Sequence, residues 1–377
     1  MTGRLSRTFF FILLIVAGVG FFVVPLGETS GQYEVDEGVT PTPGPPPEEA
    51  TTFSPVPPID ISHLSSNPVR LTRGGCCSYA GWSADSEWIL YLDGETDEVS
   101  PGLYSIPRKG GSSIQWTDRY GAFSQDWSLV AYPENGQVFV ERWADKTRWT
   151  IPSNGREVSI SPDLMGVAWE FGSQSIQSPD RRQTQIWIAN STGDDARELI
   201  TVHGGAFHGW VGGSEAILIT GRLAPHSPAG IWRVDTTTGA ALLLFEVEKP
   251  RSISLSSSGE WIAFIIAFEQ DALRNGIWVM KTDGSFTQRL FRFGAYRWRA
   301  DGQLLLIPLE LDVDHPGLYQ LDIEKGRVWR LIDPELVSLE IANNDWSVSP
   351  DGNWLLYHSS EDRNLWVMEL PKLPNAP

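Results

Sequence analysis

The sequence predicts an all-β protein, a β-propeller built from four-stranded blades, and three observations predict it. An aliphatic–aromatic pair recurs seven times at a period of about 44 residues, the length of one propeller blade. A turn-forming stretch and an apolar strand precede each pair. A second turn and a further strand follow it. Seven repeats predict seven blades, and six is the alternative if the weak repeat around Trp210 is not a blade.

The aliphatic–aromatic pair marks one strand of each repeat, because aromatic and β-branched side chains favour strands. The seven pairs are Leu103-Tyr104, Val138-Phe139, Ile186-Trp187, Ile231-Trp232, Ile277-Trp278, Leu318-Tyr319 and Leu365-Trp366.

The strand before each pair opens with residues that favour turns. Its clearest copy is "SPDGNWLLY", Ser349 to Tyr357, in which Pro, Asp and Gly set or tolerate the turn dihedrals and the rest is apolar. Two copies depart from this pattern, because Gly166 replaces a large residue and the stretch from Val211 to Ser214 lacks the Asp. The other copies begin at Ser83, Ser124, Ser256 and Arg299.

The last repeat lacks an outer strand, which predicts how the ring closes. It ends at "NLWVMELP", whereas the globular part opens with "PVRLTRG", an outer-strand sequence with no repeat before it. We therefore expect Val69–Thr72 to pair beside Leu365–Leu370, an arrangement that leaves no long sheet edge exposed.

These repeats resemble the TolB-type, WD-repeat-like propeller family. The resemblance rests on "PVRLTRG", on "GWSADSEWILY" and on "SPDGNWLLYHSSEDRNLWVMEL", and it covers about residues 63–371. It implies a propeller outside the cytoplasm. It carries no catalytic residues to this chain, because the family includes binding and scaffold proteins as well as the propeller halves of serine peptidases.

The N-terminus predicts a membrane anchor and a tether. Residues 9–26 are apolar, Arg4 and Arg7 precede them, and the stretch approaches the ~20 residues that cross a bilayer. We therefore expect a single-pass signal anchor with the propeller outside the cytoplasm, in the periplasm or at the cell surface; a cleaved signal peptide is the alternative. The predicted parts are a stub and transmembrane helix (1–27), a Pro-rich tether (28–62), the propeller (63–371) and a tail (372–377).

Composition and motifs exclude several classes of function. The net charge of −18 excludes nucleic acid as a partner, because neutralising phosphates needs basic residues. The sequence has neither the G-x-S-x-G elbow of serine hydrolases nor a phosphate-binding loop. We therefore predict no catalytic residue, no cofactor and no enzymatic activity. Most of the 17 Trp are expected to pack between blades.

Cys76 and Cys77 are adjacent and are the only cysteines. Two thiols outside the cytoplasm tend to oxidise, although neighbouring Cα atoms lie closer than in an ordinary disulfide. The sequence leaves three interpretations open: a vicinal disulfide, two buried thiols, or a redox or ligand switch.

Three acidic loops predict a binding face. They follow the apolar strands of repeats one, six and seven, and ring closure would make those repeats neighbours. The face would suit a basic peptide or protein, with Ca²⁺ as the alternative occupant because it prefers oxygen ligands. The metal candidates are Asp93, Asp97, Asp312 and Asp314; the whole candidate face is Asp93, Glu95, Asp97, Asp312, Asp314, Glu361 and Asp362.

The sequence thus favours a non-enzymatic, membrane-anchored module that binds or scaffolds a protein or ligand, with a monomeric propeller. One alternative is a propeller enzyme, a lyase or glycan hydrolase, with its site at the mouth of the central channel. The other alternative is a sensor or regulatory domain of the cell envelope.

Overall fold

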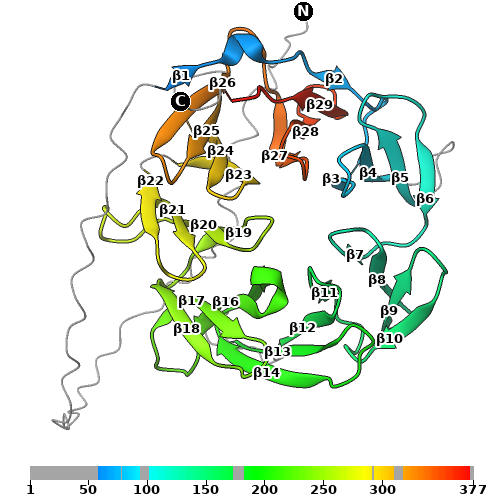
Figure 1. The fold of residues 1–377 in the computed structure, drawn as a ribbon, viewed down its shortest axis with the longest axis vertical. Helices are drawn as coiled ribbons and strands as arrows, with labels where there is room; N and C mark the ends of the chain where they lie inside the picture. Colours follow the sequence, from blue (N-terminus) through cyan, green and yellow to red (C-terminus); the bar gives the residue numbers. More distant parts are fainter. Residues whose placement is uncertain are drawn as a thin grey trace, which may run out of the picture. The chain divides into compact units, whose positions relative to one another are not determined.

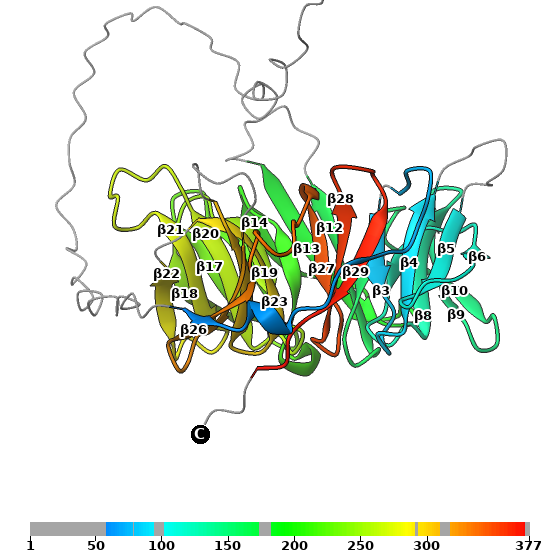
Figure 2. The ribbon, with the colours of Figure 1, turned by 90° about the horizontal axis from the view of Figure 1, so that it is seen from above.

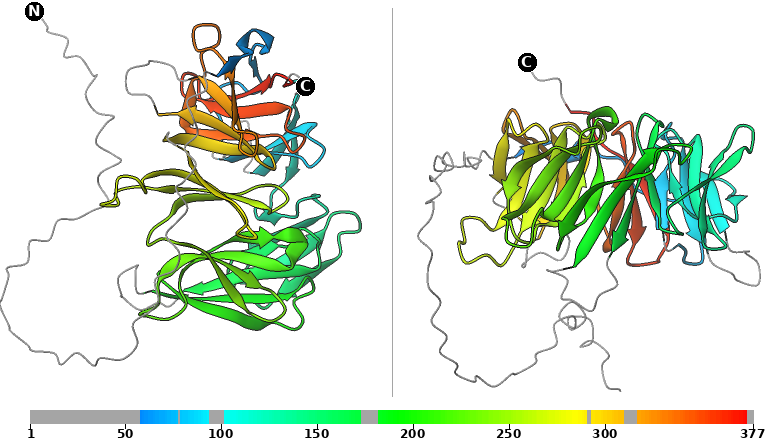
Figure 3. Two further views of the ribbon diagram at one scale, coloured as in Figure 1. Left: turned by 60° about the vertical axis from the view of Figure 1, so that its left-hand side comes forward. Right: turned by 90° about the horizontal axis from the view of Figure 1, so that it is seen from below.

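A computed structural model describes residues 58–77, 79–93, 102–172, 182–290, 293–309 and 317–373. All of them belong to one unit, Glu49–Pro377. They form β-strands and two short 3-10 turns, η1 (Ser62–Leu64) and η3 (Gly212–Ser214), and this described part contains no α-helix. The sheets stand side by side around a central axis (Figures 1 and 3), so the predicted all-β propeller is confirmed.

Four of the sheets have four strands each. Three of these are consecutive meanders with the first strand innermost, and the fourth takes its outer strand from the N-terminal segment (Figure 1). Their strands are β3 (Tyr79–Trp82), β4 (Trp88–Asp93), β5 (Gly102–Pro107) and β6 (Ile114–Thr117); β7 (Ala122–Phe123), β8 (Leu129–Glu134), β9 (Gln137–Arg142) and β10 (Arg148–Ile151); β19 (Arg251–Leu255), β20 (Trp261–Ile266), β21 (Gly276–Lys281) and β22 (Thr287–Leu290); and β27 (Ile341–Val348), β28 (Trp354–Ser359), β29 (Leu365–Glu369) and β2 (Val69–Arg70).

The other two sheets are larger. One has five strands, β23 (Gly294–Ala300), β24 (Gln303–Pro308), β25 (Leu318–Asp322), β26 (Arg327–Ile332) and β1 (Ile59–Asp60). The other has eight, β11 (Val158–Ile160), β12 (Gly166–Gly172), β13 (Gln183–Asn190), β14 (Arg197–His203), β15 (Phe207–Val211), β16 (Ala216–Arg222), β17 (Ala229–Asp235) and β18 (Ala241–Glu246).

The prediction of seven separate four-stranded sheets is wrong for the described residues. They form six sheets, because the runs β11–β14 and β15–β18 join where His203 of β14 faces Arg222 of β16. Each of the other five sheets has the size of a single blade. The join lies at the end of β16 far from η3, where Gly205 and Gly221 allow close backbone approach. A Cβ on Gly205 would collide with the carbonyl of Thr220, and one on Gly221 would lie 3.0 Å from that of His203.

A repeated hydrogen-bond pattern explains why the turn sequence recurs. In the clearest copies a Ser hydroxyl donates to the Asp two residues later, and the same hydroxyl accepts the backbone N–H five residues later at 2.8–2.9 Å. The turn therefore fixes where the second strand starts. Its Gly position needs a positive φ, which is 71° at Gly352 and 62° where Ser86 replaces the glycine.

The predicted ring closure is confirmed. Val69 faces Val367 and Arg70 faces Trp366 in an antiparallel pair of β2 with β29, and the amide of Leu71 donates to the carbonyl of Leu365 at 2.8 Å.

The N-terminal segment also makes a second attachment, which the sequence analysis missed. Ile59 and Asp60 add a parallel strand to β26, facing Trp329 and Arg330. Figure 2 shows the segment, in blue, running from β26 to β29 along the outside of both sheets. The propeller therefore includes residues before position 63. We call residues 59–72 the clasp.

The core lies between neighbouring sheets, as the Trp-rich composition predicts. We call the sheet of β27, β28, β29 and β2 the closing sheet. One buried cluster lies between the closing sheet and β3–β6, around Trp82 and Leu356, and another lies between β7–β10 and β11–β14, around Val140 and Trp169. Further clusters lie between each pair of neighbours from β11–β14 onward to the closing sheet. Among the described residues, no buried cluster joins β3–β6 to β7–β10.

The predicted localisation, a single-pass membrane protein with the propeller outside the cytoplasm, needs correction. In the part of the chain that the structure describes, no helix is long and apolar enough to cross a membrane. The predicted anchor, residues 9–26, and the tether up to residue 57 lie outside the described residues.

Candidate functional site

A cleft of about 760 Å³ lies where the buried cluster between β3–β6 and β7–β10 is missing. It extends around the inner strand β7. Its walls come from β3, β4 and β5, from the linker and turn on either side of β7, from β8 and β9, and from the residues that lead into β11. The lining residues are Tyr79, Gly81, Trp82, Leu90, Leu92, Leu103, Tyr120, Gly121, Ala122, Phe123, Ser124, Gln125, Trp127, Ala131, Pro133, Val138, Gly155, Glu157 and Val158.

The local sequence explains why space remains there. Strand β7 has two residues, whereas the inner strands β23 and β27 have seven and eight. Gly121, just before β7, passes so close to β8 that a Cβ would collide with the carbonyl of Ala131. Gly81 in β3 contributes no side chain, and a Cβ there would lie 3.4 Å from the hydroxyl of Tyr79. Because β7 is short and Gly81 has no side chain, the side of β3 that faces the cleft stays uncovered.

Aromatic side chains supply much of the cleft wall. Tyr79 is 58% exposed and Tyr120 42% exposed, while Phe123 and Trp127 are half-buried. Trp116 of β6 stacks on this wall, with ring centroids 5.7 Å from Phe123 and 5.3 Å from Trp127. The stacking crosses from one sheet to the next, so it holds both rings in place.

The cleft carries negative charge. Glu157 is its one charged lining residue, and its side chain is exposed. Tyr79 is more than half exposed, and its hydroxyl lies close to Gly81. Partial burial and, to a smaller extent, the negative charge of Asp345 on β27 raise the pKa of Tyr79.

Trp82 borders the cleft but packs in the core between β3–β6 and the closing sheet. The residue is 7% exposed, and its buried indole N–H has no hydrogen-bond partner among the described residues.

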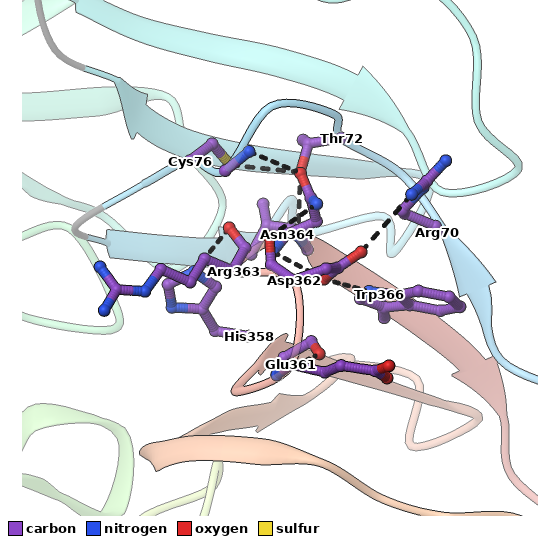
Figure 4. Close-up of polar contacts among 12 residues, drawn as sticks. Arg70, Thr72, Cys76, His358, Glu361, Asp362, Arg363, Asn364 and Trp366 are labelled. Carbon is purple, nitrogen blue, oxygen red and sulfur yellow. Dashed lines mark hydrogen bonds and ion pairs between the residues drawn. The ribbon is translucent and has the colours of Figure 1, made fainter. Parts of the chain in front are cut away.

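The structure describes three of the seven residues predicted for the acidic face, and Asp362 among them has a structural role. Its carboxylate accepts the Trp366 indole N–H at 3.0 Å and the Asn364 amide at 3.0 Å, and it lies 3.6 Å from Arg70 of the clasp (Figure 4). Burial opposes the charge, but these contacts outweigh it and lower the pKa of Asp362.

The other two described members of the face lie in different sheets. Asp93 ends β4 opposite Gly102, and Glu361 is exposed in the turn after β28. The remaining candidates, Glu95, Asp97, Asp312 and Asp314, lie outside the described residues.

Cys76 and Cys77 are joined by a disulfide, with their Cα atoms 3.7 Å apart. Both are half-buried against the core between β3–β6 and the closing sheet. The amide of Cys76 donates to the carbonyl of Arg363 at 2.7 Å, and its sulfur lies 3.3 Å from the hydroxyl of Thr72 (Figure 4). The disulfide therefore continues the contacts by which the clasp holds the closing sheet.

No group of three His, Cys, Asp or Glu residues suited to a metal ion occurs within the described ranges. One acid–base pair lies beside the inner strands, with Asp345 3.5 Å from Nδ1 of His358. The other ring nitrogen of His358 is 3.0 Å from the carbonyl of Arg363. Both nitrogens thus contact the protein, and the pair positions the turn after β28 rather than offering a free base.

Comparison with known proteins supports the fold alone. No family model matches the chain, and no curated protein matches it. An oligogalacturonate lyase in complex with manganese is similar in structure, with a TM-score of 0.56 at 11% identity, over 81% of this chain and 91% of that one. The β-propeller domain of the Trilobed protease from Pyrococcus furiosus, described as having an open velcro topology, gives 0.51 at 14% identity over 83% and 99%.

The two structures above support the propeller fold, and membership in the TolB-type family stays a prediction. A putative TolB from Agrobacterium tumefaciens is 19% identical over 70% of this chain and 95% of that one, with a TM-score of 0.40. All of these identities are too low to transfer an activity, so the function has to be argued from this chain's own cleft.

The cleft residues were missed by the sequence analysis. Tyr79 and Tyr120 lie outside the repeated motifs, and Trp127 occupies the glycine position of its turn, with a φ of 63°. The local signals are this Trp in a turn and the short apolar stretch after Gly121.

Proposed function

We propose that this protein is a non-enzymatic binding module that takes its ligand in the cleft around β7. The observation that carries the proposal is the cleft itself, about 760 Å³ with exposed aromatic rings at a junction between sheets. Ligand sites are typically concave, of about 300–1,000 Å³, and mostly apolar with a few polar groups. This cleft has that size and that composition.

The contacts elsewhere favour binding over catalysis. The acid–base pair that lies beside the inner strands, Asp345 and His358, is committed to protein contacts. The cleft wall, by contrast, presents aromatic rings together with one carboxylate. Such a wall can recognise a ligand by shape, stacking and charge without a nucleophile or a general base.

Filling the cleft with one side chain tests this function. Gly81→Leu adds a side chain to the wall at a position where a Cβ makes only ordinary contacts. Gly166→Leu is the matched control, because Gly166 also lies in a strand, lines a separate cleft of about 270 Å³ and would make similar contacts. Binding of indole, benzylammonium, benzoate and methyl galactoside would be measured by saturation-transfer NMR.

We expect at least one of these probes to bind the wild type and Gly166→Leu, and to lose at least tenfold in affinity for Gly81→Leu. Circular dichroism and thermal unfolding check that both variants keep the fold. The proposal fails if no probe binds the wild type, or if Gly81→Leu binds as the wild type does.

A further inference from the structure

We propose that the cleft around β7 selects organic cations, namely a guanidinium or alkylammonium group on an aliphatic stem. This inference rests on the proposed binding function and names its ligand class. The same chemistry occurs in a free alkylguanidine or alkylamine and in an arginine or lysine side chain of a peptide.

The aromatic rings of the cleft provide the first argument. A cation over the face of Trp, Tyr or Phe is attracted by the ring, and more strongly where water is displaced. Tyr79 and Tyr120 are exposed, and Phe123 and Trp127 are held by the stacking of Trp116. Two tyrosine rings are therefore accessible, beside two rings that are held in place, and the fixed part of the wall lowers the entropy cost of binding.

The protein's own cations provide the second argument, because they cover aromatic rings outside the cleft. Lys146 lies 3.9 Å from the ring centre of Trp143, Arg108 lies 4.5 Å from that of Trp354, and Arg119 lies 4.8 Å from that of Tyr132. No such contact to Tyr79, Tyr120, Phe123 or Trp127 is found in the described part of the chain. The cleft thus holds aromatic faces that can receive a cation from a ligand.

Charge provides the third argument. Glu157 lines the cleft, is exposed and forms no ion pair with any residue that the structure describes. No Lys, Arg or His lines the cleft, and the field of Asp345 reaches Tyr79 at its other end. A cation in the cleft would be attracted by Glu157, whereas no basic side chain lines the cleft to attract an anion.

The cleft itself does not distinguish a free alkylguanidine or alkylamine from an arginine or lysine side chain, so the test separates the two sources.

The test compares ligands that differ in charge but not in shape. Butylguanidinium and butylurea are titrated by calorimetry, and so are the peptides acetyl-Gly-Arg-Gly-amide and its citrulline counterpart. We expect each cation to bind about tenfold more tightly than its neutral partner. Glu157→Gln should remove most of this preference without changing affinity for butylurea. Glu335→Gln, which changes an exposed glutamate outside the cleft, should leave both affinities unchanged.

Each outcome decides a separate question. Tighter binding of the arginine peptide than of butylguanidinium identifies a peptide side chain as the source, and the reverse identifies a small molecule. Equal binding of cation and neutral partner, lost in Gly81→Leu, overturns the cation preference but leaves the binding function intact. If neither cation binds, the inference is overturned. Binding of benzoate or indole that is lost in Gly81→Leu would in that case still support the proposed binding function of the cleft.

Discussion

At the scale of single residues, the role of a carboxylate depends on the side chains around it. The sequence analysis grouped Asp362 with the binding residues because its loop is acidic, yet Arg70, Asn364 and Trp366 hold it in the ring closure. Glu157 was in no acidic cluster, yet it lines the cleft without an ion pair to a described residue. Local charge density in a sequence does not report which carboxylates already have partners, because those partners come from distant repeats.

A half-buried histidine leads to a prediction about how stability depends on pH. His208 of β15 lies 3.0 Å from the hydroxyl of Thr220, and burial lowers the pKa of His208 to about 4. The unfolded chain, with an ordinary histidine pKa near 6.5, therefore binds a proton before the folded protein does. Stability should be complete above about pH 6.5 and should fall towards pH 4, by on the order of 3 kcal/mol.

Urea unfolding at several pH values measures this effect. His208→Gln, which keeps a polar group for Thr220 but cannot take up a proton in this range, should flatten the loss between pH 6.5 and 4. His226→Gln, at an exposed turn, should retain the full pH dependence of the wild type. An unchanged pH profile in His208→Gln would show that another group is responsible.

At the scale of elements, the clasp shows both the reach and the limit of sequence reasoning. The pairing of β2 with β29 could be predicted because the last repeat lacks an outer strand and "PVRLTRG" supplies one. The pairing of β1 with β26 could not, because Ile59 and Asp60 form too short a strand to show any periodicity and follow a Pro-rich stretch. Burial of Ile61 and the ion pair of Asp60 with Arg330 fix it instead.

Two neighbouring isoleucines test the energetic role of this element. Ile61 is 5% exposed and packs in the cluster around Trp329 and Leu370, whereas Ile59 is 49% exposed. Ile61→Ala should cost about 2–5 kcal/mol of unfolding free energy, because the cavity adds to the lost burial. Ile59→Ala should cost less than about 1 kcal/mol. Equal losses in the two variants, measured by urea denaturation, would show that β1 is not anchored through Ile61.

At the scale of the whole molecule, the repeat pattern determined the architecture but not the site. Periodic strands, recurring Ser-x-Asp turns and the closure were all readable, because each depends on residues close in sequence or on a missing strand. The cleft depends on how two sheets fail to pack over one short inner strand, and the joined eight-stranded sheet depends on one pair, His203 with Arg222. Both features arise where one repeat differs from the others, so the shared repeat pattern does not predict them.

Amide hydrogen exchange with and without butylguanidinium tests the location of the site in the intact protein. A ligand in the cleft should slow exchange in residues 79–82, 120–127 and 155–158, which line it from three different strands and turns. Residues 359–364, in the acidic turn of the closing sheet, should exchange at unchanged rates. Slower exchange in residues 359–364 with none around β7 would contradict the account and return the binding face to the acidic loops.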